Sequence, residues 1–430
     1  MSAMTYDQAL AFLESTHTFG SKLGLSRISA LCDHLGNPED KLKFVHIAGT
    51  NGKGSTAAYI SSILMKAGYR TGCFTSPYIQ RFTERITVNG EEISTDDITR
   101  YTEMIMRRIE IMQAKGIEHP TAFELYTAMC FLHFVDQGCD IVVLETGLGG
   151  SIDSTNVIKS KEAAVITNIG YDHMEQLGNT LEEIASKKAG IITCPCDVVV
   201  YPMESSIQSV FTAAAEAHGC RIHLLSADDV KITGGFFMPQ FDFAGFSGLT
   251  IRLLGEHQYY NASLSALTCQ ALRAKGWNIT DSHIRDGLAD AKWPGRMEVM
   301  RRDPLFIIDG AHNTQGSEVL AKGLGSFKHG GVTFIIGVMR DKEYERMFGN
   351  VAHLAKRFLT ITPDNPRAMP ARELADFTSG FAPSTAFDSV PEALRFAIDT
   401  TPEDEIICAF GSLYYIGQVR DFFERMAEHD

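Results

Sequence analysis

The chain has 430 residues, of which 44% are hydrophobic and 21% are charged. One hydrophobic core rarely organises a chain of this length, so the sequence predicts two unequal globular domains with room for a cleft between them. The formal net charge of −14 argues against a nucleic acid partner, because binding to a phosphate backbone normally needs a basic face. A small-molecule substrate is expected instead.

No apolar run is long enough to span a membrane, and the N-terminal segment lacks a basic start followed by a continuous apolar stretch. We therefore expect no membrane association and no export signal, and we predict a cytoplasmic protein that works as a monomer. The nine cysteines are scattered and lie mostly in apolar segments, which favours reduced thiols. Cys194 and Cys196 have no matching second pair, so we interpret them as structural or incidental rather than as zinc ligands.

Short apolar runs alternate with amphipathic stretches from about Lys43 onward. The runs predicted as strands are FVHIAG, RTGCFTS, IVVLE, AAVITN and DVVVY, and a helix is predicted to begin at Ser55. Such alternation predicts an α/β fold with a mostly parallel sheet, helices on both faces and a ligand site in the loops at the strand ends. The aromatic, glycine-rich stretch from Asp228 to Leu254 predicts antiparallel strands at the edge of this domain or a surface hairpin.

A second alternating series begins after the segment WPGR, which ends at Arg296. The runs LFIID, VTFIIG, RFLTIT and EIICAFG predict a smaller, Rossmann-like α/β domain. Proline and glycine favour a linker, so we place the boundary at Pro294 and predict domains over residues 1–294 and 295–430.

The segment HIAGTNGKGS, from His46 to Ser55, stands between a predicted strand and a predicted helix, which is the context of a phosphate-binding loop. Its glycines let backbone N–H groups face an anion at the positive end of the helix. Lys53 would reach the β- and γ-phosphates of ATP, and Ser55 would cap the helix or hold Mg²⁺ through water. The predicted ATP-binding residues of this loop are Gly49, Thr50, Asn51, Gly52, Lys53, Gly54 and Ser55. An ordinary glycine-rich turn is the alternative.

Six blocks follow one another along the chain: GTNGKGS, TSPYIQRFTERI, ETGLGGSIDSTN, DHMEQLG running into KKAG, WPGR and DGAHN. Together they closely resemble the folylpolyglutamate synthase and dihydrofolate synthase family, which belongs with the Mur-type ligases. The blocks lie between residues 46 and 313 and so extend over both predicted domains. The resemblance implies an ATP-dependent ligase that adds L-glutamate to tetrahydrofolate, and in some members also to dihydropteroate, through an acyl phosphate.

Glu145 closes the run IVVLE, so its carboxylate is expected at the carboxyl edge of the sheet, where a hard oxygen donor suits Mg²⁺. The resemblance makes Glu145, Ser76 and His173 magnesium ligands. It also implies that CO₂ carbamylates Lys188, which turns a cation into an anionic oxygen donor beside the metal. Lys188 and Lys53 are therefore predicted catalytic residues.

The resemblance assigns further nucleotide contacts to residues of the second half. Arg296 would reach the phosphates and Asp309 the ribose, while Asn261 matches an asparagine on the adenine side. A solvent-facing helical residue is the alternative for Asn261. His312, in the block DGAHN, is expected to face the cleft near the incoming glutamate and is the third predicted catalytic residue. Because both domains supply residues, closure of the cleft is a further hypothesis.

The substrate side rests on the same resemblance. Arg85 belongs to a loop that the family folds over the ATP and folate sites. The segments that would meet the pterin or pteroate group comprise Thr121, Ala122, Phe123 and Glu124, followed by Ile152, Asp153 and Ser154. An aromatic wall with a few polar groups suits a flat heteroaromatic ligand. Alternatively, Phe123 and Tyr126 are core residues on one helix face.

Two other functions remain open at this stage. A cell-wall ligase of the Mur type would use the same acyl-phosphate chemistry, but the blocks TSP, KAG and DGAHN weigh against it. A nucleotide-dependent switch would give Glu145, His173 and Lys188 little reason to converge. Within the favoured family, the residues do not distinguish a chain-lengthening synthase from a bifunctional enzyme.

Overall fold

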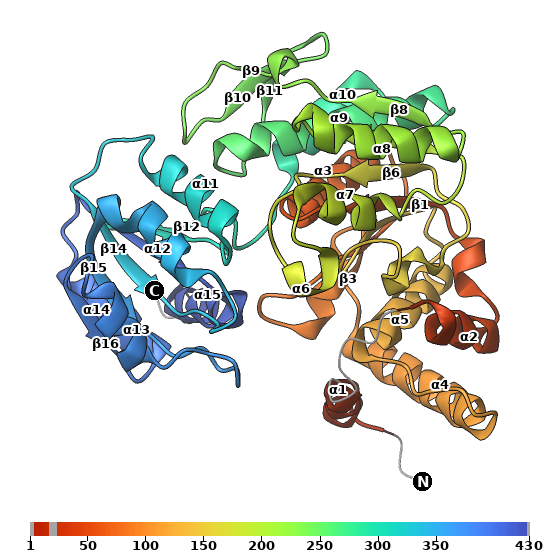
Figure 1. Ribbon diagram of the computed structural model, residues 1–430, viewed down its shortest axis with the longest axis horizontal. Coiled ribbons are helices and arrows are strands. Elements are labelled where there is room, and N and C mark those ends of the chain that lie inside the picture. The colour runs from red at the N-terminus through yellow and green to blue at the C-terminus, as the bar shows by residue number, and fades with distance from the viewer. Residues whose placement is uncertain (1–3, 17–23, 428–430) are drawn as a thin grey trace.

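The computed structural model describes residues 4–16 and 24–427. It contains an eight-stranded sheet built from residues 44–224 and a six-stranded sheet built from residues 298–410. The two sheets lie side by side along the longest axis of the molecule (Figure 1). The predicted α/β fold, with a mostly parallel sheet followed by a smaller α/β sheet, is confirmed.

The eight-stranded sheet has the order β4-β3-β2-β5-β1-β6-β7-β8. Its strands are β1 (Phe44–Ala48), β2 (Thr71–Phe74), β3 (Ile86–Val88), β4 (Glu91–Glu92), β5 (Ile141–Glu145), β6 (Ala163–Ile166), β7 (Asp197–Val200) and β8 (Arg221–Leu224). The strands from β2 to β8 in this order run parallel, whereas β3 and β4 form an antiparallel edge. Parallel strands end at the same edge, so β1, β5 and β6 bring their following loops together.

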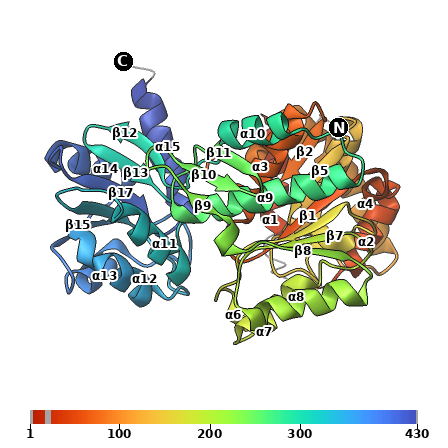
Figure 2. The same cartoon turned by 90° about the horizontal axis from the view of Figure 1, so that it is seen from above.

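Helices cover both faces of this sheet because its buried strands place alternate apolar side chains on opposite sides. The helices of this part are α1 (Tyr6–Ser15), α2 (Ser26–Leu35), α3 (Lys53–Lys66), α4 (Thr95–Ala114), α5 (Ala122–Asp136), α6 (Met174–Leu177), α7 (Leu181–Ala189), α8 (Ser205–Ala217), α9 (Glu256–Ala274) and α10 (Asp281–Asp290). Val45 and Val143 pack with α3, α9 and α10, whereas Phe44 and Val142 pack with α2, α4 and α5. Figure 2 shows α9 and α10 on one side and α7 and α8 on the other.

The segment between Asp228 and Leu254 forms antiparallel strands, as predicted. The strands β9 (Lys231–Ile232), β10 (Gln240–Phe243) and β11 (Phe246–Thr250) make a three-stranded sheet of their own and do not extend the large sheet. Phe241, Phe246 and Leu249 are buried in the core that contains α3, α9 and α10.

The six-stranded sheet has the order β12-β13-β17-β14-β15-β16, and only β12 is antiparallel to its neighbour. Its elements are β12 (Glu298–Arg302), β13 (Leu305–Ile308), α11 (Thr314–Leu324), β14 (Val332–Ile336), α12 (Tyr344–Val351), β15 (Ala355–Thr360), α13 (Ala371–Thr378), β16 (Ser384–Ala386), α14 (Val390–Thr400), β17 (Ile406–Phe410) and α15 (Leu413–Ala427). The helices α11, α12 and α13 cover one face, and α14 and α15 cover the other.

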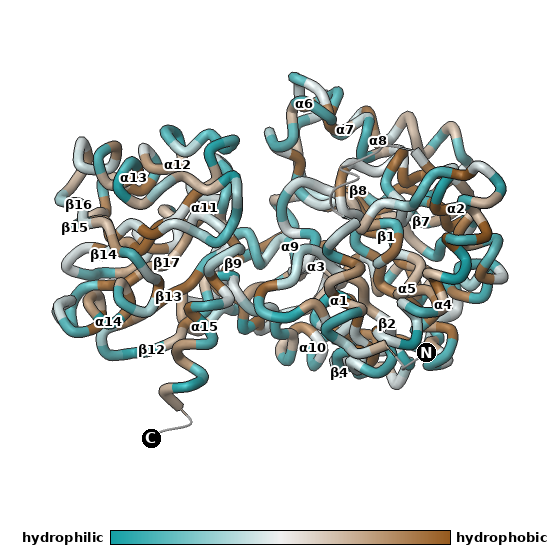
Figure 3. Tube along the Cα trace, turned by 90° about the horizontal axis from the view of Figure 1, so that it is seen from below, coloured by the Kyte–Doolittle hydropathy of each residue, from teal (hydrophilic) through white to brown (hydrophobic). Residues whose placement is uncertain are grey.

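Apolar segments gather in the strands of both bodies, while hydrophilic segments lie towards the outside (Figure 3). Short 3-10 helices span Pro38–Lys41, Phe82–Arg85, Ser154–Val157, Ala227–Asp229 and Ala352–Leu354. None of the helices in residues 4–16 and 24–427 is both long and apolar enough to cross a membrane.

Candidate active site

The glycine-rich segment lies between β1 and α3, as the sequence predicts. The helix begins at Lys53, two residues before the predicted start, and Gly52 is its N-cap with φ 88°. An L side chain is strained at such a φ, and a Cβ atom on Gly52 would lie only 2.7 Å from Asn261 Oδ1. Both the backbone conformation and the close approach of Asn261 therefore require glycine at this position.

Ser55 does not cap α3, so that part of its predicted role is wrong. The left-handed Gly52 begins the helix instead, which leaves Ser55 buried inside the first turn. Ser55 Oγ accepts a hydrogen bond from Gln258 Nε2 at 3.1 Å, and Gln258 Oε1 accepts one from Asn261 Nδ2 at 3.1 Å. Asn261 is only 2% exposed, so the alternative of a solvent-facing asparagine is also wrong. It lies beneath the loop.

Two lysine side chains converge on the loop. Lys53 Nζ donates hydrogen bonds to Gly49 O at 3.2 Å and to Thr50 O at 3.3 Å. Lys188 Nζ, from the end of α7, donates to the same Gly49 O at 2.7 Å. Burial, and next the nearby charge of Lys53, lower the pKa of Lys188 to about 7. A large fraction of its amine is therefore neutral near pH 7.

Glu145 ends β5 at the carboxyl edge of the sheet and is buried. Its Oε2 accepts a hydrogen bond from Ser76 N at 3.2 Å, and its Oε1 lies 3.9 Å from Lys53 Nζ. Burial raises the pKa of Glu145, and the Lys53 charge acts against this rise. A buried carboxylate with one oxygen free of hydrogen bonds at the loop has the chemistry that a hard divalent cation requires.

The predicted metal ligands are brought together only in part. Ser76 contacts Glu145 through its backbone N–H. His173 precedes α6 in the left-handed conformation, and its side chain is 51% exposed. Within residues 4–16 and 24–427, no hydrogen bond or ion pair joins His173 to Ser76 or Glu145. Burial, and next the charge of Lys342, lower the pKa of His173, while the charge of Asp172 acts against this fall.

A polar cluster around Asp172, which the sequence analysis did not single out, joins the two sheets. Lys342 Nζ donates to Asp172 Oδ1 at 2.9 Å, Asn313 Nδ2 donates to Oδ2 at 3.3 Å, and His312 Nε2 lies 4.0 Å from Oδ2. Burial raises the pKa of Asp172, but the charges of Lys342 and His173 outweigh this and hold it well below its usual range. Asp172 is therefore an anion.

The phosphate loop itself also contacts the second sheet. Asn51 Nδ2 donates to Gln315 Oε1 at 2.7 Å, and Asn51 Oδ1 accepts from Asn313 Nδ2 at 3.2 Å. The approach is close, because a Cβ atom on Gly170 would lie 2.3 Å from Gln315 Oε1. The start of α11 therefore lies directly against the loop.

Arg296 and Asp309 lie together after the linker. Asp309 is buried; its Oδ2 accepts from Met297 N at 2.8 Å and its Oδ1 from Ala311 N at 2.7 Å. Arg296 Nη1 donates to Gly295 O at 3.0 Å. Asp309 thus anchors the linker to the end of β13, a role that the sequence analysis missed.

His312 also has a fixed orientation. Its Nδ1 lies 2.8 Å from Gly310 O, which can only accept, so Nδ1 carries the proton. Burial, and next the charge of Lys342, lower the pKa of His312 to about 4. The ring is therefore neutral at pH 7, with an unprotonated Nε2 directed towards Asp172.

The predicted substrate segments are largely bonded within the protein. Thr121 N and Oγ1 donate to Glu124 Oε2 at 2.7 and 2.9 Å in the capping box of α5, where Arg27 Nε lies 3.1 Å from the same oxygen. Asp153 Oδ2 accepts from Leu148 N at 2.7 Å. Thr121, Glu124 and Asp153 are buried, and these hydrogen bonds fix their positions.

Three other predicted substrate residues of the two segments, Ser154, Ala122 and Ile152, lie beside them. Ser154 Oγ lies 2.8 Å from Thr127 Oγ1, so it is bonded to α5. Ala122 is buried, and Ile152 is half-buried.

The two aromatic residues Phe123 and Tyr126 differ in burial. Tyr126 is buried, which agrees with a core residue, whereas Phe123 is only partly buried. A Cβ atom on Gly147 would lie 2.5 Å from the Phe123 ring, so this ring covers the loop that follows β5.

Arg85 lies among the aromatic side chains. Its guanidinium is 4.9 Å from the ring centroid of Tyr78 and 5.1 Å from that of Tyr126. Within the described part of the chain it has no ion-pair partner, and its Nε is buried without a hydrogen bond. Burial lowers its pKa.

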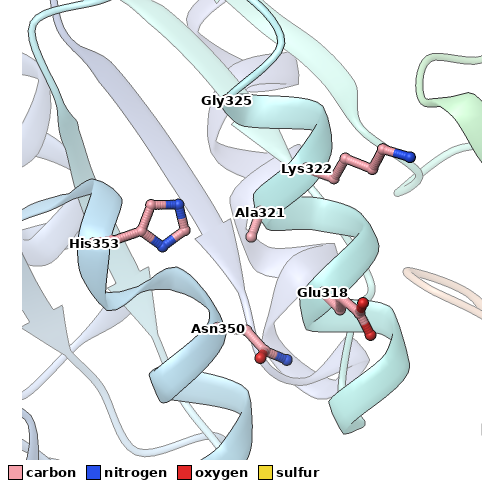
Figure 4. A pocket seen from close by; sticks show the side chains of 6 residues that line it. All are labelled: Glu318, Ala321, Lys322, Gly325, Asn350 and His353. Atoms are coloured by element: carbon pink, nitrogen blue, oxygen red, sulfur yellow. The ribbon is translucent and has the colours of Figure 1, made fainter.

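A separate hollow lies between α11 and α12 (Figure 4). Its lining residues are Glu318, Ala321, Lys322, Gly325, Asn350 and His353. Asn350 Nδ2 donates to Thr314 O and to Ser317 Oγ, both at 3.0 Å, and so fastens α12 to α11. None of the predicted site residues lines this hollow.

Comparison with known families matches both halves of the chain. Residues 47–269 match the family described as the Mur ligase middle domain, and residues 295–413 match the Mur ligase, glutamate ligase domain. The chain is similar to the dihydrofolate synthase/folylpolyglutamate synthase of Bacillus subtilis (strain 168), with 37% identity over 96% of this chain and 98% of that protein. It is also similar to the folylpolyglutamate synthase of Lacticaseibacillus casei, with 32% identity over 97% of this chain and 98% of that protein.

Solved structures agree with this likeness. The Mycobacterium tuberculosis folylpolyglutamate synthase complexed with ADP and AMPPCP superposes with a TM-score of 0.87 at 29% identity, over 97% of this chain and 99% of that one. Escherichia coli FolC in complex with DHPP and ADP superposes with a TM-score of 0.86 at 29% identity, over 99% of each chain.

Proposed function

This chain belongs to the folylpolyglutamate synthase and dihydrofolate synthase family of Mur ligases, and from that premise we propose how its residues divide the work. It is an ATP-dependent acid–amino-acid ligase that joins L-glutamate to a folate-type carboxylate. The relatives extend over nearly the whole chain, which favours this reaction over a cell-wall ligase or a nucleotide-dependent switch. The acceptor is proposed to be tetrahydrofolate or its glutamyl forms, with dihydropteroate as a second acceptor.

The convergence of Lys53 and Lys188 on Gly49 O carries the assignment of the ATP site. The Lys53 ammonium lies at the N-terminus of α3, where backbone N–H groups already favour an anion. In the proposed complex, Lys53 leaves the loop carbonyls for the β- and γ-phosphates, and the backbone from Gly49 to Ser55 surrounds them. Arg296 is proposed to reach the phosphates.

Asn261 and Asp309 are proposed to contact the nucleoside. Asn261, on the adenine side, is already held against Gly52 by Gln258. Asp309 would use the remaining lone pairs of its anchored carboxylate for the ribose hydroxyl groups. A pre-positioned side chain loses little entropy on binding, so both contacts are consistent with a preformed nucleotide site.

Mg²⁺ fits the donors present at the carboxyl edge. Within the described residues, Glu145 Oε1 has no hydrogen-bond partner, Ser76 lies beside Glu145, and the exposed side chain of His173 can turn towards a ligand. These three residues are proposed to hold the ion, which would neutralise charge on the phosphates of bound ATP.

Lys188 is proposed to carry a carbamate. With its pKa near 7, part of the amine is neutral at physiological pH and can attack CO₂. A nitrogen–carbon bond forms and a proton is released, so a buried cation becomes an anion. The neighbouring Lys53 and the metal would stabilise that anion better than they stabilise a second ammonium.

The reaction proceeds in two displacements. An oxygen of the acceptor carboxylate attacks the γ-phosphorus of ATP in line, and ADP leaves. The amino group of glutamate then attacks the acyl carbon, and inorganic phosphate leaves with the oxygen that it received. Lys53 and the loop N–H groups stabilise the charge that develops on the transferred phosphoryl group. His312, whose neutral Nε2 faces Asp172, is proposed to accept a hydrogen bond from the incoming ammonium.

The acceptor is proposed to lie along the wall formed by Phe123 and Arg85. The guanidinium of Arg85 has aromatic neighbours but no anionic partner within the described residues, which suits a ligand that is both flat and anionic. The segments from Thr121 to Glu124 and from Ile152 to Ser154 are proposed to hold the wall in place. We further propose domains over residues 1–294 and 295–430, and a monomer in the cytoplasm, where ATP and glutamate are abundant.

The test is ADP release by the purified protein with MgATP, supplied with either a reduced monoglutamyl folate or dihydropteroate, with and without L-glutamate. Sustained turnover that needs both the acceptor and glutamate is expected. Turnover with folate alone would assign a chain-lengthening synthase, and turnover with both acceptors would assign a bifunctional enzyme. ADP release that is indifferent to glutamate would contradict the proposed reaction.

A further inference from the structure

Three cysteine side chains meet at the amino edge of the eight-stranded sheet, opposite the edge that carries the phosphate loop. Cys194 and Cys196 lie between α7 and β7, and Cys220 directly precedes β8. The two strands are parallel with Asp197 opposite Arg221, so the residues just before them are also neighbours. Arg221 N donates to Cys196 O at 3.2 Å, and Cys196 Sγ lies 3.9 Å from Cys220 Sγ.

This placement suits a disulfide between Cys196 and Cys220. Neighbouring strands are spaced at about 4.8 Å, which falls inside the range of roughly 4.4–6.8 Å that disulfides need between their Cα atoms. The sulfurs can therefore reach bonding distance, about 2.05 Å, by side-chain rotation with little movement of the backbone. Cys220 Sγ also lies 3.3 Å from Cys194 O, so the third cysteine belongs to the same cluster.

Cys194 is the reactive member of this cluster. It is half-buried; a hydrogen bond from Cys196, and next the charge of Lys161, lower the pKa of its thiol to about 6 although burial opposes this. These surroundings favour the thiolate form of Cys194. The thiols of Cys196 and Cys220, the Lys161 ammonium and the Thr193 hydroxyl are the groups that face it.

Lys161 is a buried basic residue of the same region. Lys161 is only 5% exposed, and its Nζ donates to Ile191 O, to Thr193 Oγ1 at 3.2 Å and to Asn156 Oδ1 at 3.5 Å. Within residues 4–16 and 24–427 it has no carboxylate partner. Burial lowers the pKa of Lys161, and the nearby thiols of Cys194, Cys196 and Cys220 act against this fall.

From this geometry we propose that Cys194, Cys196 and Cys220 form an oxidation site for hydroperoxides that ends in a disulfide between Cys196 and Cys220. The Cys194 thiolate attacks a peroxide oxygen, the O–O bond breaks, and a proton converts the leaving oxygen to an alcohol or water. The resulting sulfenic acid is attacked by the Cys196 thiol, which forms a disulfide and releases water. Cys220 then attacks Cys196 Sγ, which forms the final disulfide and returns Cys194 as a thiolate.

The balance of this sequence is simple. One hydroperoxide is reduced, two thiols are oxidised, and their two hydrogens leave in the alcohol and water. Within the described residues, no group of three or more histidine, cysteine or acidic side chains has the arrangement of a metal site. No local pattern in the sequence indicates this cluster, because Cys220 lies 24 residues after Cys196.

Cys139 supplies a matched control inside the same chain. It is also half-buried, but burial raises the pKa of its thiol to about 11. At pH 7 we expect alkylation of Cys194 to be roughly 30- to 100-fold faster than that of Cys139, because the gain in thiolate fraction exceeds the loss of nucleophilicity.

The experiment treats the folded full-length protein with one equivalent of hydrogen peroxide and maps the cysteines by mass spectrometry. We expect a disulfide between Cys196 and Cys220 with Cys139 unmodified. Cys194→Ser should slow disulfide formation at least about tenfold, since the initial thiolate is missing. Cys220→Ser should stop the reaction at an oxidised Cys194, trapped by a sulfenic-acid reagent or bonded to Cys196.

Thermal unfolding of the reduced variants shows whether each is folded. Both cysteine variants should unfold within a few degrees of the unmodified protein, because serine preserves the size of the side chain. Oxidation of Cys139 at the same rate as Cys194, or formation of the Cys196–Cys220 disulfide in Cys194→Ser at the unaltered rate, would overturn the proposal. The experiment measures no ligase activity, so its result is independent of the proposed function.

Discussion

The Asn313 side chain contacts both the phosphate loop and the Asp172 cluster, yet these two regions use charge in opposite ways. At the loop, the side chains of Lys53 and Lys188 both donate to the neutral Gly49 O, and the Glu145 carboxylate lies 3.9 Å from Lys53 Nζ. At the cluster, the Asp172 carboxylate has an ammonium partner at 2.9 Å. The Lys53 ammonium is thus bonded mainly to neutral carbonyl oxygens and can bind an anionic ligand, whereas the charge of Asp172 is paired within the protein.

This difference separates binding from assembly. An ammonium that is hydrogen-bonded to neutral carbonyl oxygens can exchange them for phosphate oxygens at little cost in free energy. The pair of Lys342 and Asp172 instead spans the two sheets and would leave a partly buried charge if either partner were removed. Changes at the loop should therefore act mainly on turnover, and changes at the cluster mainly on stability and on the relative position of the sheets.

The largest effect is expected for Lys53→Met. Loss of the ammonium that we propose to bind the β- and γ-phosphates should lower kcat/KM by about 10²- to 10³-fold, as for removal of one donor from a transition-state charge. The melting temperature should change little, since Lys53 is bonded to carbonyls of its own loop. Lys66→Met, at the exposed end of the same helix, is the control and should keep full turnover. Equal losses in the two variants would contradict a specific role for Lys53.

Gly52→Ala should follow, through ATP binding. A left-handed alanine costs about 1–2 kcal/mol, and the new methyl group would collide with Asn261, so the KM for ATP should rise at least about tenfold. Gly68→Ala is a close control, because Gly68 has φ 86° at the end of α3 but nothing within 4 Å of the added Cβ. Backbone strain should lower the free energy of unfolding of Gly68→Ala by a similar amount, while its KM for ATP stays unchanged. ATP titrations and thermal melts distinguish the two effects.

The pH dependence of Lys188 comes next. Its folded pKa of about 7 means that the amine is mostly protonated below pH 6 and mostly neutral above pH 8. Labelling with ¹³C bicarbonate should therefore give a carbamate signal that grows as pH rises through 7, together with several-fold higher turnover. Lys188→Gln should lack the signal. A carbamate signal that is constant between pH 6 and 8 would contradict the lowered pKa.

A smaller effect on activity, with a clear effect on stability, is expected for Lys342→Met. The change leaves Asp172 without its ammonium partner, and unfolding should become easier by about 1–3 kcal/mol. Because Asn313 connects the cluster with the loop, the KM values for ATP and glutamate should rise together by a few-fold. Chemical denaturation checks the stability. Full stability combined with a rise in only one KM would show that Lys342 binds a substrate and does not join the sheets.

The smallest effect is expected for Lys322→Met. Lys322 pairs with Glu256 at 2.7 Å between α11 and α9, and so crosses between the same parts of the molecule as Lys342. Its side chain is 67% exposed, and water screens such a pair. Lys322→Met should lower the free energy of unfolding by less than about 0.5 kcal/mol. A loss equal to that of Lys342→Met would mean that any crossing contact matters, whatever its burial.

The parts of this molecule that could be predicted from the sequence are those encoded by neighbouring residues. The run IVVLE is strand β5 and ends at Glu145, and the glycine loop stands between β1 and α3. Local signals erred where tertiary packing decides. Serine is a common N-cap residue, but Gly52 is the N-cap of α3. The Ser55 hydroxyl instead accepts a hydrogen bond from Gln258, about two hundred residues away.

Clusters between distant segments gave no local signal. Asp172 and Lys342 are separated by 170 residues and meet only because the second sheet lies against the first. The same holds for Cys196 and Cys220, which become neighbours through the register of β7 and β8. No spacing along the chain indicates either pair. Asp172, which directly precedes His173 in the block DH, was the one residue that a closer examination of the motif could have singled out.

The most direct test of the ligase chemistry uses an acceptor whose terminal carboxylate carries ¹⁸O. If the carboxylate attacks ATP and the acyl phosphate is then opened by glutamate, one ¹⁸O atom must pass from the acceptor to each inorganic phosphate. Mass spectrometry of the phosphate formed with MgATP and L-glutamate should therefore show one label per turnover. Unlabelled phosphate, accompanied by formation of the glutamyl product, would contradict the acyl-phosphate route that we assign to the loop around Lys53 and Lys188.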